Sequence, residues 1–207
     1  MTAKRELIAI DIDDVIADTN AAFWAWSNEV TGKALTREHF AIDADYWGYY
    51  EKIWEMNDIA HLKVDDFLDG LMADQSHMDI LPGAQLGLQE LAKQFDLVFV
   101  TSRNPNMEKA TRSWLERHIT DNFDLFFAKA GHHAYGAAAS SKGEICKELG
   151  ATLLIDDNVE HVQSALDNGV EAVLFGNYGW QRDIPEAAFR AEAWSDVLEY
   201  VNDRRKS

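Results

Sequence analysis

The sequence predicts an α/β fold, a doubly wound parallel sheet with a small helical cap inserted after strand one. Three observations predict it. Short apolar runs of strand length recur along the chain, stretches with the apolar spacing of helices lie between them, and one long segment after the first run contains no convincing strand. Strands that alternate with helices favour a parallel sheet covered on both faces.

The predicted strands are short apolar runs, most of them rich in Val, Ile or Phe. These runs are Leu7–Ile10, Leu97–Val100, Leu125–Phe127, Leu153–Ile155 and Ala172–Phe175. Their order along the chain predicts a sheet of at least these strands, each separated from the next by helical segments.

The predicted helices carry apolar stripes. The stripe residues are Leu86 and Leu91; Met107, Ala110, Trp114 and Leu115; and Val159, Val162 and Ala165. We expect Leu86–Gln94 to turn its two leucines inward. The second helix follows a capping Asn104 with Pro105 at its first position, and the third ends at Gly169.

The segment between the first strand and Pro82 is too long for a plain loop in a compact domain. It is rich in aromatic residues: Phe23, Trp24, Trp26, Phe40, Tyr46, Trp47, Tyr49, Tyr50, Trp54 and Phe67. We interpret it as a helical cap whose aromatic residues mainly fill its own core, while a few contact a ligand at the edge of the sheet. The expected division is a core of residues 1–18 and 81–207 and a cap of residues 19–80.

Charge and composition exclude several classes of partner. The formal net charge of −17 repels duplex nucleic acid and anionic membranes, so a small anion binds only where local cations overcome this field. The single cysteine, Cys146, cannot form an intramolecular disulfide. No apolar run reaches the roughly 18 residues that a spanning helix needs, and Leu7–Ile10 is too short for a signal peptide. We expect a soluble, cytoplasmic monomer or homodimer.

Polar clusters follow three of the predicted strands, and a lysine opens a helix. The clusters are Asp11-Ile12-Asp13-Asp14, Thr101-Ser102-Arg103, Lys142 and Asp156-Asp157. Ligands of open parallel sheets bind beyond the carboxyl ends of the strands. Each acid alone can also be a simple helix cap. Their shared position at one edge favours a single site.

Lys142 is informative because of its place in a helix. Ser141 and Glu144 have the spacing of a capping box, and Gly150 predicts the C-terminal end. The lysine then lies in the first turn, where the helix dipole disfavours a cation by roughly 0.3–1 kcal/mol. Its placement is explained if an anion lies between it and the helix amides, although a solvated lysine can also tolerate this cost.

The clustered acids require a cation. Two bare charges 4 Å apart repel by about 4 kcal/mol at an effective dielectric constant near 20. Oxygen ligands such as Asp11, Asp13 and Asp156 suit Mg²⁺, which also takes phosphate oxygens. Asp11 and Asp13 point to the same side of an extended backbone, so one can attack while the other serves as acid and base. The residues thus predict a metal-bound phosphate site.

These motifs resemble the phosphatase branch of the haloacid dehalogenase superfamily. The pattern is D-x-D-x-V at Asp11 to Val15, then Thr101, then Lys142, then the pair Asp156-Asp157, and it extends from residue 7 to about residue 178. Within the superfamily, "DIDDVIADT", "TSRN", "KGEICKELGATLLIDDN" and "LFGNYGW" are similar to the 5′(3′)-deoxyribonucleotidase group.

The resemblance implies a role for each motif residue. Asp11 is the expected nucleophile, and Asp13 the general acid and base that also binds the metal through its backbone carbonyl. Asp156 is an expected Mg²⁺ ligand and Asp157 supports the metal site. Thr101 and Ser102 are expected to contact the phosphate, and Lys142 to neutralise phosphate and nucleophile. Beyond the resemblance, Arg103 and Arg182 are further candidates for phosphate or substrate contacts.

Two positions depart from the pattern of that group. Asp14 stands where it usually has glycine, and Thr19 where relatives that stack a pyrimidine commonly carry an aromatic residue. Two alternatives follow: another cap aromatic, such as Trp47, recognises the nucleobase, or nucleobase recognition has been lost.

The expected function is Mg²⁺-dependent hydrolysis of phosphomonoesters through an aspartyl-phosphate, on deoxyribonucleoside monophosphates. The alternatives are a phosphatase for another small phosphorylated metabolite and a catalytically silent protein that binds phosphate esters. Carbon–halogen hydrolysis needs no acid for a leaving alkoxide, so Asp13 argues against it. A phosphorylatable receiver is disfavoured because an acid pair here follows the lysine.

We predict no metal-binding or catalytic role for the adjacent histidines or for the single cysteine. His132 and His133 are adjacent and lack further ligands at zinc spacing. Cys146 is expected to be a buried structural thiol. We expect "GHHAYGAAASS" to be a mobile loop and "WSDVLEYVND" a peripheral helix.

Overall fold

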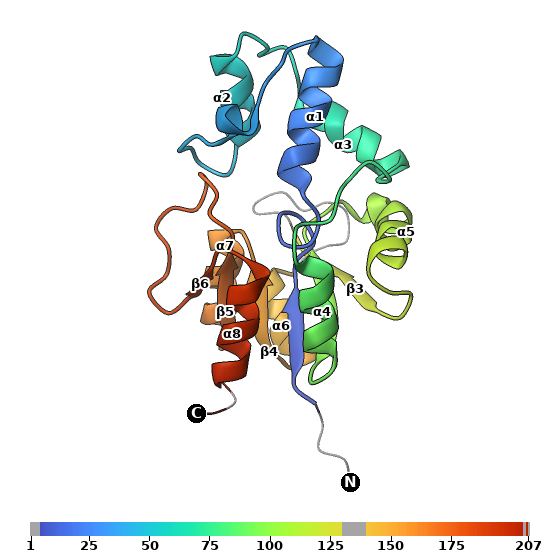
Figure 1. The fold of residues 1–207 in the computed structure, drawn as a ribbon. Coiled ribbons are helices and arrows are strands. Elements are labelled where there is room, and N and C mark those ends of the chain that lie inside the picture. The colour runs from blue at the N-terminus through green and yellow to red at the C-terminus, as the bar shows by residue number, and fades with distance from the viewer. Residues whose placement is uncertain (1–4, 130–139, 205, 207) are drawn as a thin grey trace.

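A single parallel sheet organises the computed structural model, which describes residues 5–129, 140–204 and 206 (Figure 1). Within these residues the sheet has six strands in the order β3-β2-β1-β4-β5-β6. The strands are β1 (Leu7–Ile10), β2 (Asp96–Thr101), β3 (Asp124–Phe127), β4 (Ala151–Asp156), β5 (Glu171–Phe175) and β6 (Phe189–Ala191). All neighbouring strands pair in parallel, which confirms the predicted fold class.

Strand β1 is the centre of the sheet. It lies between β2 and β4, and Ile8 and Ile10 are fully buried. Such a strand is covered on both faces, and for this reason its sequence is an unbroken apolar run. Ile10 pairs with Phe99 on one side and with Ile155 on the other. This register brings the residues that follow β1 and end β4 to the same edge.

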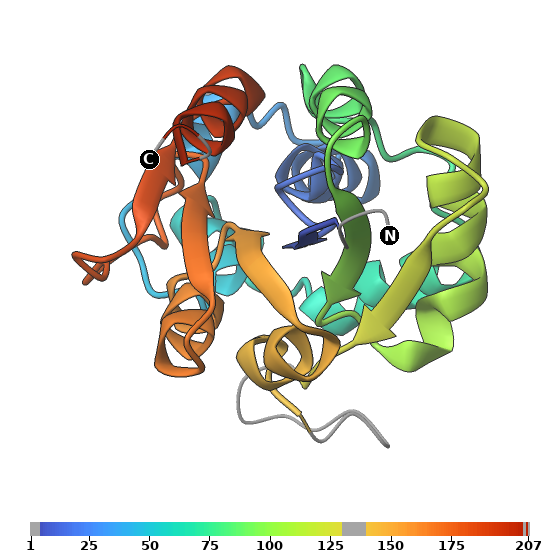
Figure 2. The same cartoon turned by 90° about the horizontal axis from the view of Figure 1, so that it is seen from below.

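Helices cover both faces of the sheet, as Figure 2 shows, with α4 and α8 on one face and α6 and α7 on the other. The helices of this part are α4 (Ala84–Ala92), α5 (Glu108–His118, after a 3₁₀ turn at Pro105–Met107), α6 (Lys142–Leu149), α7 (Val159–Asp167) and α8 (Trp194–Arg204). The capping box of Ser141 and Glu144 and the left-handed Gly150 bound α6 as predicted.

Two details of the sequence prediction are wrong. Leu86 does not point inward, because α4 begins earlier and buries Ala84, Gly87, Leu88 and Leu91, leaving Leu86 60% exposed. Gly87 is part of this stripe because the ring of Trp194 occupies the space where a Cβ would lie. Strand β6 was not predicted, because three residues with a central arginine do not form an apolar run.

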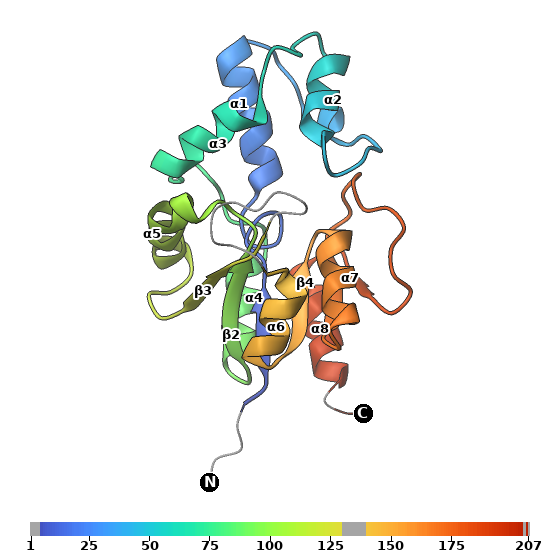
Figure 3. The ribbon, with the colours of Figure 1, turned by 180° about the vertical axis from the view of Figure 1, so that it is seen from behind.

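The segment between Asp18 and Leu81 is helical and lies beyond the carboxyl end of the sheet (Figures 1 and 3). It contains α1 (Thr19–Thr31), a 3₁₀ turn (Arg37–Phe40), α2 (Tyr49–Met56) and α3 (Val64–Ala73), with no strand among them. Its two ends meet, because the amide of Asp18 donates to the carbonyl of Asp79 at 2.9 Å. We propose this meeting point as the boundary between a core of residues 1–18 and 81–207 and a cap of residues 19–80.

Aromatic side chains fill the interior of this helical segment, as predicted for most of them. Phe23 stacks on Tyr50 with 3.7 Å between ring centroids and contacts Phe67 at 3.8 Å. Trp54 is fully buried, and its indole N–H donates to the Ser27 hydroxyl at 2.9 Å. Trp47, in contrast, is 45% exposed.

Cys146 is a buried structural thiol, as predicted. It lies on the inner side of α6, and burial, followed by the charge of Asp156, raises the pKa of its thiol to about 12. No helix among the described residues has the length and apolar character needed to cross a membrane. The stretch "GHHAYGAAASS", predicted to be a mobile loop, lies outside the described residues from position 131 to 139, and so do His132 and His133.

The close packing of α6 on α7 is testable at Gly143. A Cβ there would lie 2.1 Å from the backbone carbonyl oxygen of Ser164, so Gly143→Ala must push the two helices apart. We expect the free energy of unfolding, measured by urea denaturation, to fall by about 1–3 kcal/mol. Gly70→Ala in α3 is the control, because nothing lies within 4 Å of its added Cβ. The control should be neutral or stabilising by up to about 1 kcal/mol, and equal losses in both variants would contradict the packing argument.

Candidate active site

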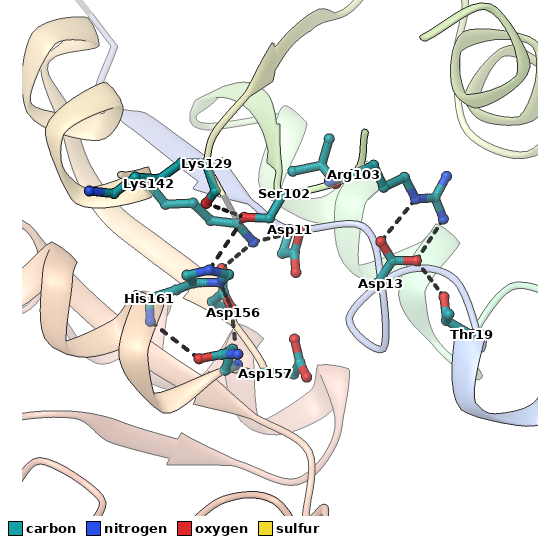
Figure 4. Close-up of polar contacts among 12 residues, drawn as sticks. Asp11, Asp13, Thr19, Ser102, Arg103, Lys129, Lys142, Asp156, Asp157 and His161 are labelled. Atoms are coloured by element: carbon teal, nitrogen blue, oxygen red, sulfur yellow. Dashed lines mark hydrogen bonds and ion pairs between the residues drawn. The ribbon is translucent and has the colours of Figure 1, made fainter. Parts of the chain in front are cut away.

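The candidate active site lies at the carboxyl edge of the sheet, where β1, β2 and β4 end side by side (Figure 4). Asp11 follows β1 directly, and its amide donates to the carbonyl of Ile155 at 2.9 Å. This bond places Asp11 beside Asp156, the last residue of β4. The parallel register therefore brings together two acids that are far apart in the sequence.

Lys142 lies between these two acids. Its ammonium is 2.8 Å from Asp11 Oδ1 and donates a hydrogen bond to Asp156 Oδ2 at 2.7 Å. The lysine side chain is fully buried. Burial alone would lower its pKa, but the charges of Asp11 and Asp156 outweigh burial and raise it. The anion that the sequence predicts beside Lys142 is thus, in this structure, a pair of carboxylates.

Asp157 joins Asp11 and Asp156 in a group of three buried acids. One carboxylate oxygen from each lies within 4.8 Å of the other two. Burial, followed by the neighbouring acids, raises the pKa of Asp157 well above its ordinary value. Burial is also the main cause that raises the pKa of Asp11, to about 7, against the lowering effect of Lys142.

This group fits a hard divalent cation. All three donors are carboxylate oxygens, the ligands that Mg²⁺ prefers. Lys142 contributes one positive charge to three acids, so a bound cation would offset the charge that remains. Lys142 and His161 outweigh burial at Asp156 and lower its pKa to about 2.

Asp13 faces a different set of partners. Its carboxylate accepts hydrogen bonds from Arg103 Nε at 2.9 Å and Nη2 at 2.7 Å. The Thr19 hydroxyl donates to the same carboxylate at 2.5 Å. Burial would raise the pKa of Asp13, but Arg103 outweighs it and lowers the pKa. The side chain of Asp13 is not part of the group formed by the other three acids, and its predicted metal contact is through the backbone carbonyl.

The side chains at the end of β2 make separate contacts. The buried Thr101 hydroxyl accepts from the amide of Arg103 at 3.2 Å. The Ser102 hydroxyl donates to the carbonyl of Lys129 at 3.2 Å. The guanidinium of Arg103 binds Asp13 instead of facing the three acids (Figure 4). Arg182 is an exposed residue that pairs with Asp45 at 3.1 Å, so the structure does not bring its charge to the acid group.

Sequence reasoning missed His161 and Trp180. His161 Nδ1 lies 3.2 Å from Asp156 Oδ1, and Nε2 lies 3.3 Å from the Ser102 hydroxyl. The available signal was its position five residues after Asp156, in the first turn of α7. Burial, followed by the charge of Lys142, lowers the pKa of His161. The Trp180 indole donates to Asp157 Oδ2 at 3.0 Å. Trp180 belongs to the "LFGNYGW" motif, for which the sequence alone predicted no role.

Asp14 has a left-handed backbone, with φ of 53°. This conformation is easiest for glycine and is tolerated by aspartate. The buried Asp14 carboxylate accepts from the amide of Asn20 at 2.9 Å, and its backbone carbonyl accepts from the Tyr178 hydroxyl at 2.9 Å. Burial raises the pKa of Asp14 well above its ordinary value.

The fold is that of the haloacid dehalogenase-like hydrolases. A haloacid dehalogenase-like protein of unknown function from Agrobacterium tumefaciens superposes with a TM-score of 0.61 at 16% identity, over 97% of this chain and 99% of that chain. A hydrolase of this kind from Streptococcus pneumoniae gives 0.57 at 15% identity, over 97% and 100%. The "putative HAD-hydrolase YfnB" from Bacillus subtilis, in a structure bound to magnesium, gives a TM-score of 0.56 at 15% identity, also over 97% and 100%.

Residues 5–139 match the family described as 5′ nucleotidase, deoxy (Pyrimidine), cytosolic type C protein. The chain therefore belongs to this family and is a phosphoric monoester hydrolase of the 5′-nucleotidase-like kind. A relative from Chlorobaculum tepidum, named "Putative 5′(3′)-deoxyribonucleotidase", is 24% identical over 213 aligned positions, which cover 97% of this chain and 92% of the relative.

The charge balance at Lys142 predicts a pH-dependent loss of stability. Lys142→Met leaves Asp11 and Asp156 buried without their cation, and we expect the free energy of unfolding to fall by about 3–5 kcal/mol. Without the lysine, both carboxyl pKa values rise in the folded state, so folding binds protons and stability falls as pH rises. Urea denaturation in EDTA should show a larger loss near pH 8 than near pH 5.

The exposed Lys147, on the same helix, gives the matched control Lys147→Met. It should change stability little at either pH. A Lys142→Met variant with an equal loss at both pH values would mean that the ammonium does not balance these acids.

Proposed function

We propose that the protein is a Mg²⁺-dependent phosphomonoester hydrolase that works through an aspartyl-phosphate on Asp11 and acts on deoxyribonucleoside monophosphates. One observation carries the proposal. A buried ammonium bridges Asp11 and Asp156 while Asp157 offers a third oxygen within 4.8 Å. A phosphate ester needs this combination, because its own negative charge must be balanced beside an anionic nucleophile.

Asp11, Asp156 and Asp157 would hold the Mg²⁺, with the backbone carbonyl of Asp13 as a further ligand. The bound ion would supply positive charge for the phosphate oxygens and so reduce their repulsion of the nucleophile. The Trp180 indole N–H supports this set, because its bond to Asp157 fixes that carboxylate beside the other two.

The side chains divide the chemistry between them. The Asp11 carboxylate attacks phosphorus, and the bond to the leaving oxygen breaks as Asp13 gives that oxygen a proton. In the second step Asp13 takes a proton from water, the water oxygen attacks the aspartyl-phosphate, and inorganic phosphate leaves. Lys142 neutralises charge on the phosphate and on Asp11, and the hydroxyls of Thr101 and Ser102 contact the phosphate. The position of Thr101 at the end of β2, at the same edge of the sheet, supports this role.

The proposed substrate class rests on family membership and on the name of the Chlorobaculum tepidum relative. Thr19 is engaged with Asp13, so a base-stacking surface must come from elsewhere. Tyr46 and Trp47 are 40% and 45% exposed, and the ring of Tyr46 packs edge-on against that of Trp180, 6.0 Å away. Because Trp180 also donates to Asp157, these two rings lie close to the acid group, and we infer that a nucleobase stacks on them.

The alternatives are a phosphatase for another small phosphorylated metabolite and a silent phosphate-ester binder. Phosphate release across a panel of deoxyribonucleotides, ribonucleotides and sugar phosphates separates them. Preference for sugar phosphates would favour the first alternative, and tight binding without any release would favour the second.

The role of Asp11 is testable with p-nitrophenyl phosphate. Asp11→Asn removes the attacking carboxylate but keeps its shape, so kcat should fall by about 10³-fold or more while the protein stays folded. Asp69→Asn changes an exposed aspartate of α3 and should retain full activity. Substantial turnover by a folded Asp11→Asn variant would refute an aspartyl-phosphate at this residue.

The metal requirement is tested by removal and replacement. Dialysis against EDTA should abolish hydrolysis of p-nitrophenyl phosphate, and added Mg²⁺ should restore it. Isothermal titration of the apoprotein with Mg²⁺ provides a readout without turnover, and Asp156→Asn should weaken that binding. Full activity in EDTA would contradict the proposal.

A further inference from the structure

Asp13 is held by a network of buried polar groups that the proposed chemistry does not itself require. Arg103 reaches both of its carboxylate oxygens, at 2.9 and 2.7 Å, and Thr19 reaches one of them at 2.5 Å. A planar guanidinium that binds both oxygens fixes the rotation of a carboxylate as well as its position. A single charged contact would leave this rotation free.

Arg103 is in turn fixed by two side chains. Its Nη1 donates to Gln75 Oε1 at 2.7 Å and to the Thr111 hydroxyl at 3.2 Å. The Gln75 amide also donates to Thr111 at 3.2 Å. Arg103, Gln75 and Thr111 are 7%, 2% and 0% exposed. The orientation of the guanidinium is therefore set by the interior of the protein and not by solvent.

These groups come from three parts of the chain. Gln75 follows α3, Thr111 lies on α5, and Arg103 follows β2. Burying such a polar network costs free energy of folding. Apolar side chains of similar volume would stabilise the fold equally well or better. The network is therefore better explained by what it orients, which is Asp13.

We propose that Arg103, braced by Gln75 and Thr111, is a positioning residue that fixes the Asp13 carboxyl group for proton transfer. This inference rests on the proposed role of Asp13 as acid and base. It differs from the expectation that Arg103 contacts the phosphate, because Arg103 then acts only through Asp13. Loss of the contacts between Arg103 and Asp13 should lower the rate of proton transfer without weakening substrate binding.

A double-mutant cycle tests this. General acid–base catalysis contributes about 10²–10⁴-fold, so Arg103→Lys, which keeps the charge but loses the two-point contact, should lower kcat/KM for phenyl phosphate by about 10–100-fold. The loss should be smaller for p-nitrophenyl phosphate, whose leaving group departs without a proton. In an Asp13→Asn background, Arg103→Lys should change kcat/KM for p-nitrophenyl phosphate by less than about threefold, because a residue acting through Asp13 has nothing left to orient.

Several results would overturn the inference. An equal loss of kcat/KM for both esters, a rise in KM alone, or a full further loss in the Asp13→Asn background would each mean that Arg103 binds substrate or only stabilises the fold. A gain in activity would mean that Arg103 holds Asp13 in a resting position. If the wild type hydrolyses neither ester, or Asp11→Asn stays active, the proposed function itself fails, and this is seen before any Arg103 variant is compared.

Two further variants keep the test decisive if Arg103→Lys fails to fold. Gln75→Met and Thr111→Val each remove one brace and leave Arg103 in place. Each variant should lower kcat/KM more for phenyl phosphate than for p-nitrophenyl phosphate. Arg112→Lys is the matched control, because Arg112 lies on α5 in an ion pair with Glu108 whose side chains are 38% and 50% exposed. Arg112→Lys should leave the hydrolysis rates of both esters unchanged. Wild-type rates for both esters in Gln75→Met and Thr111→Val would overturn the inference.

Discussion

The ion pairs of Lys142 are the constraint on which the rest of the site depends. A buried ammonium that contacts Asp11 at 2.8 Å and Asp156 at 2.7 Å joins the ends of two strands to the first turn of α6. Neither acid tolerates burial as an isolated charge, and the lysine does not tolerate it either. The three groups are stable only together, and together they leave an excess of negative charge that makes the edge of the sheet suitable for a cation.

Each remaining acid at this edge has its own support. Trp180 fixes Asp157, Arg103 and Thr19 fix Asp13, and a backbone turn with positive φ carries Asp14. The carboxyl pKa values of two of these acids shift in opposite directions. Burial, followed by the neighbouring acids, raises the pKa of Asp157, whereas Arg103 outweighs burial and lowers that of Asp13.

The helical segment beyond the sheet contributes directly to this edge. Thr19 and Gln75, near its two ends, both belong to the network around Asp13. The loop that carries Trp180 touches the same segment, because a Cβ on Gly179 would lie 1.7 Å from the carbonyl oxygen of Ile42. The segment is therefore tied to the acids on both sides of the site.

The sequence alone determined the features that depend on local periodicity and short-range hydrogen bonds. It predicted the strands that end at the site, the capped helix that begins at Lys142, and the aromatic interior of the inserted segment. Only the tertiary structure decided that Arg103 binds Asp13, that His161 contacts Asp156, and that Leu86 faces solvent. The physical reason is that a pattern of apolar residues fixes which elements form, whereas the partner of a buried polar side chain depends on groups from distant parts of the chain that only folding brings within hydrogen-bonding distance.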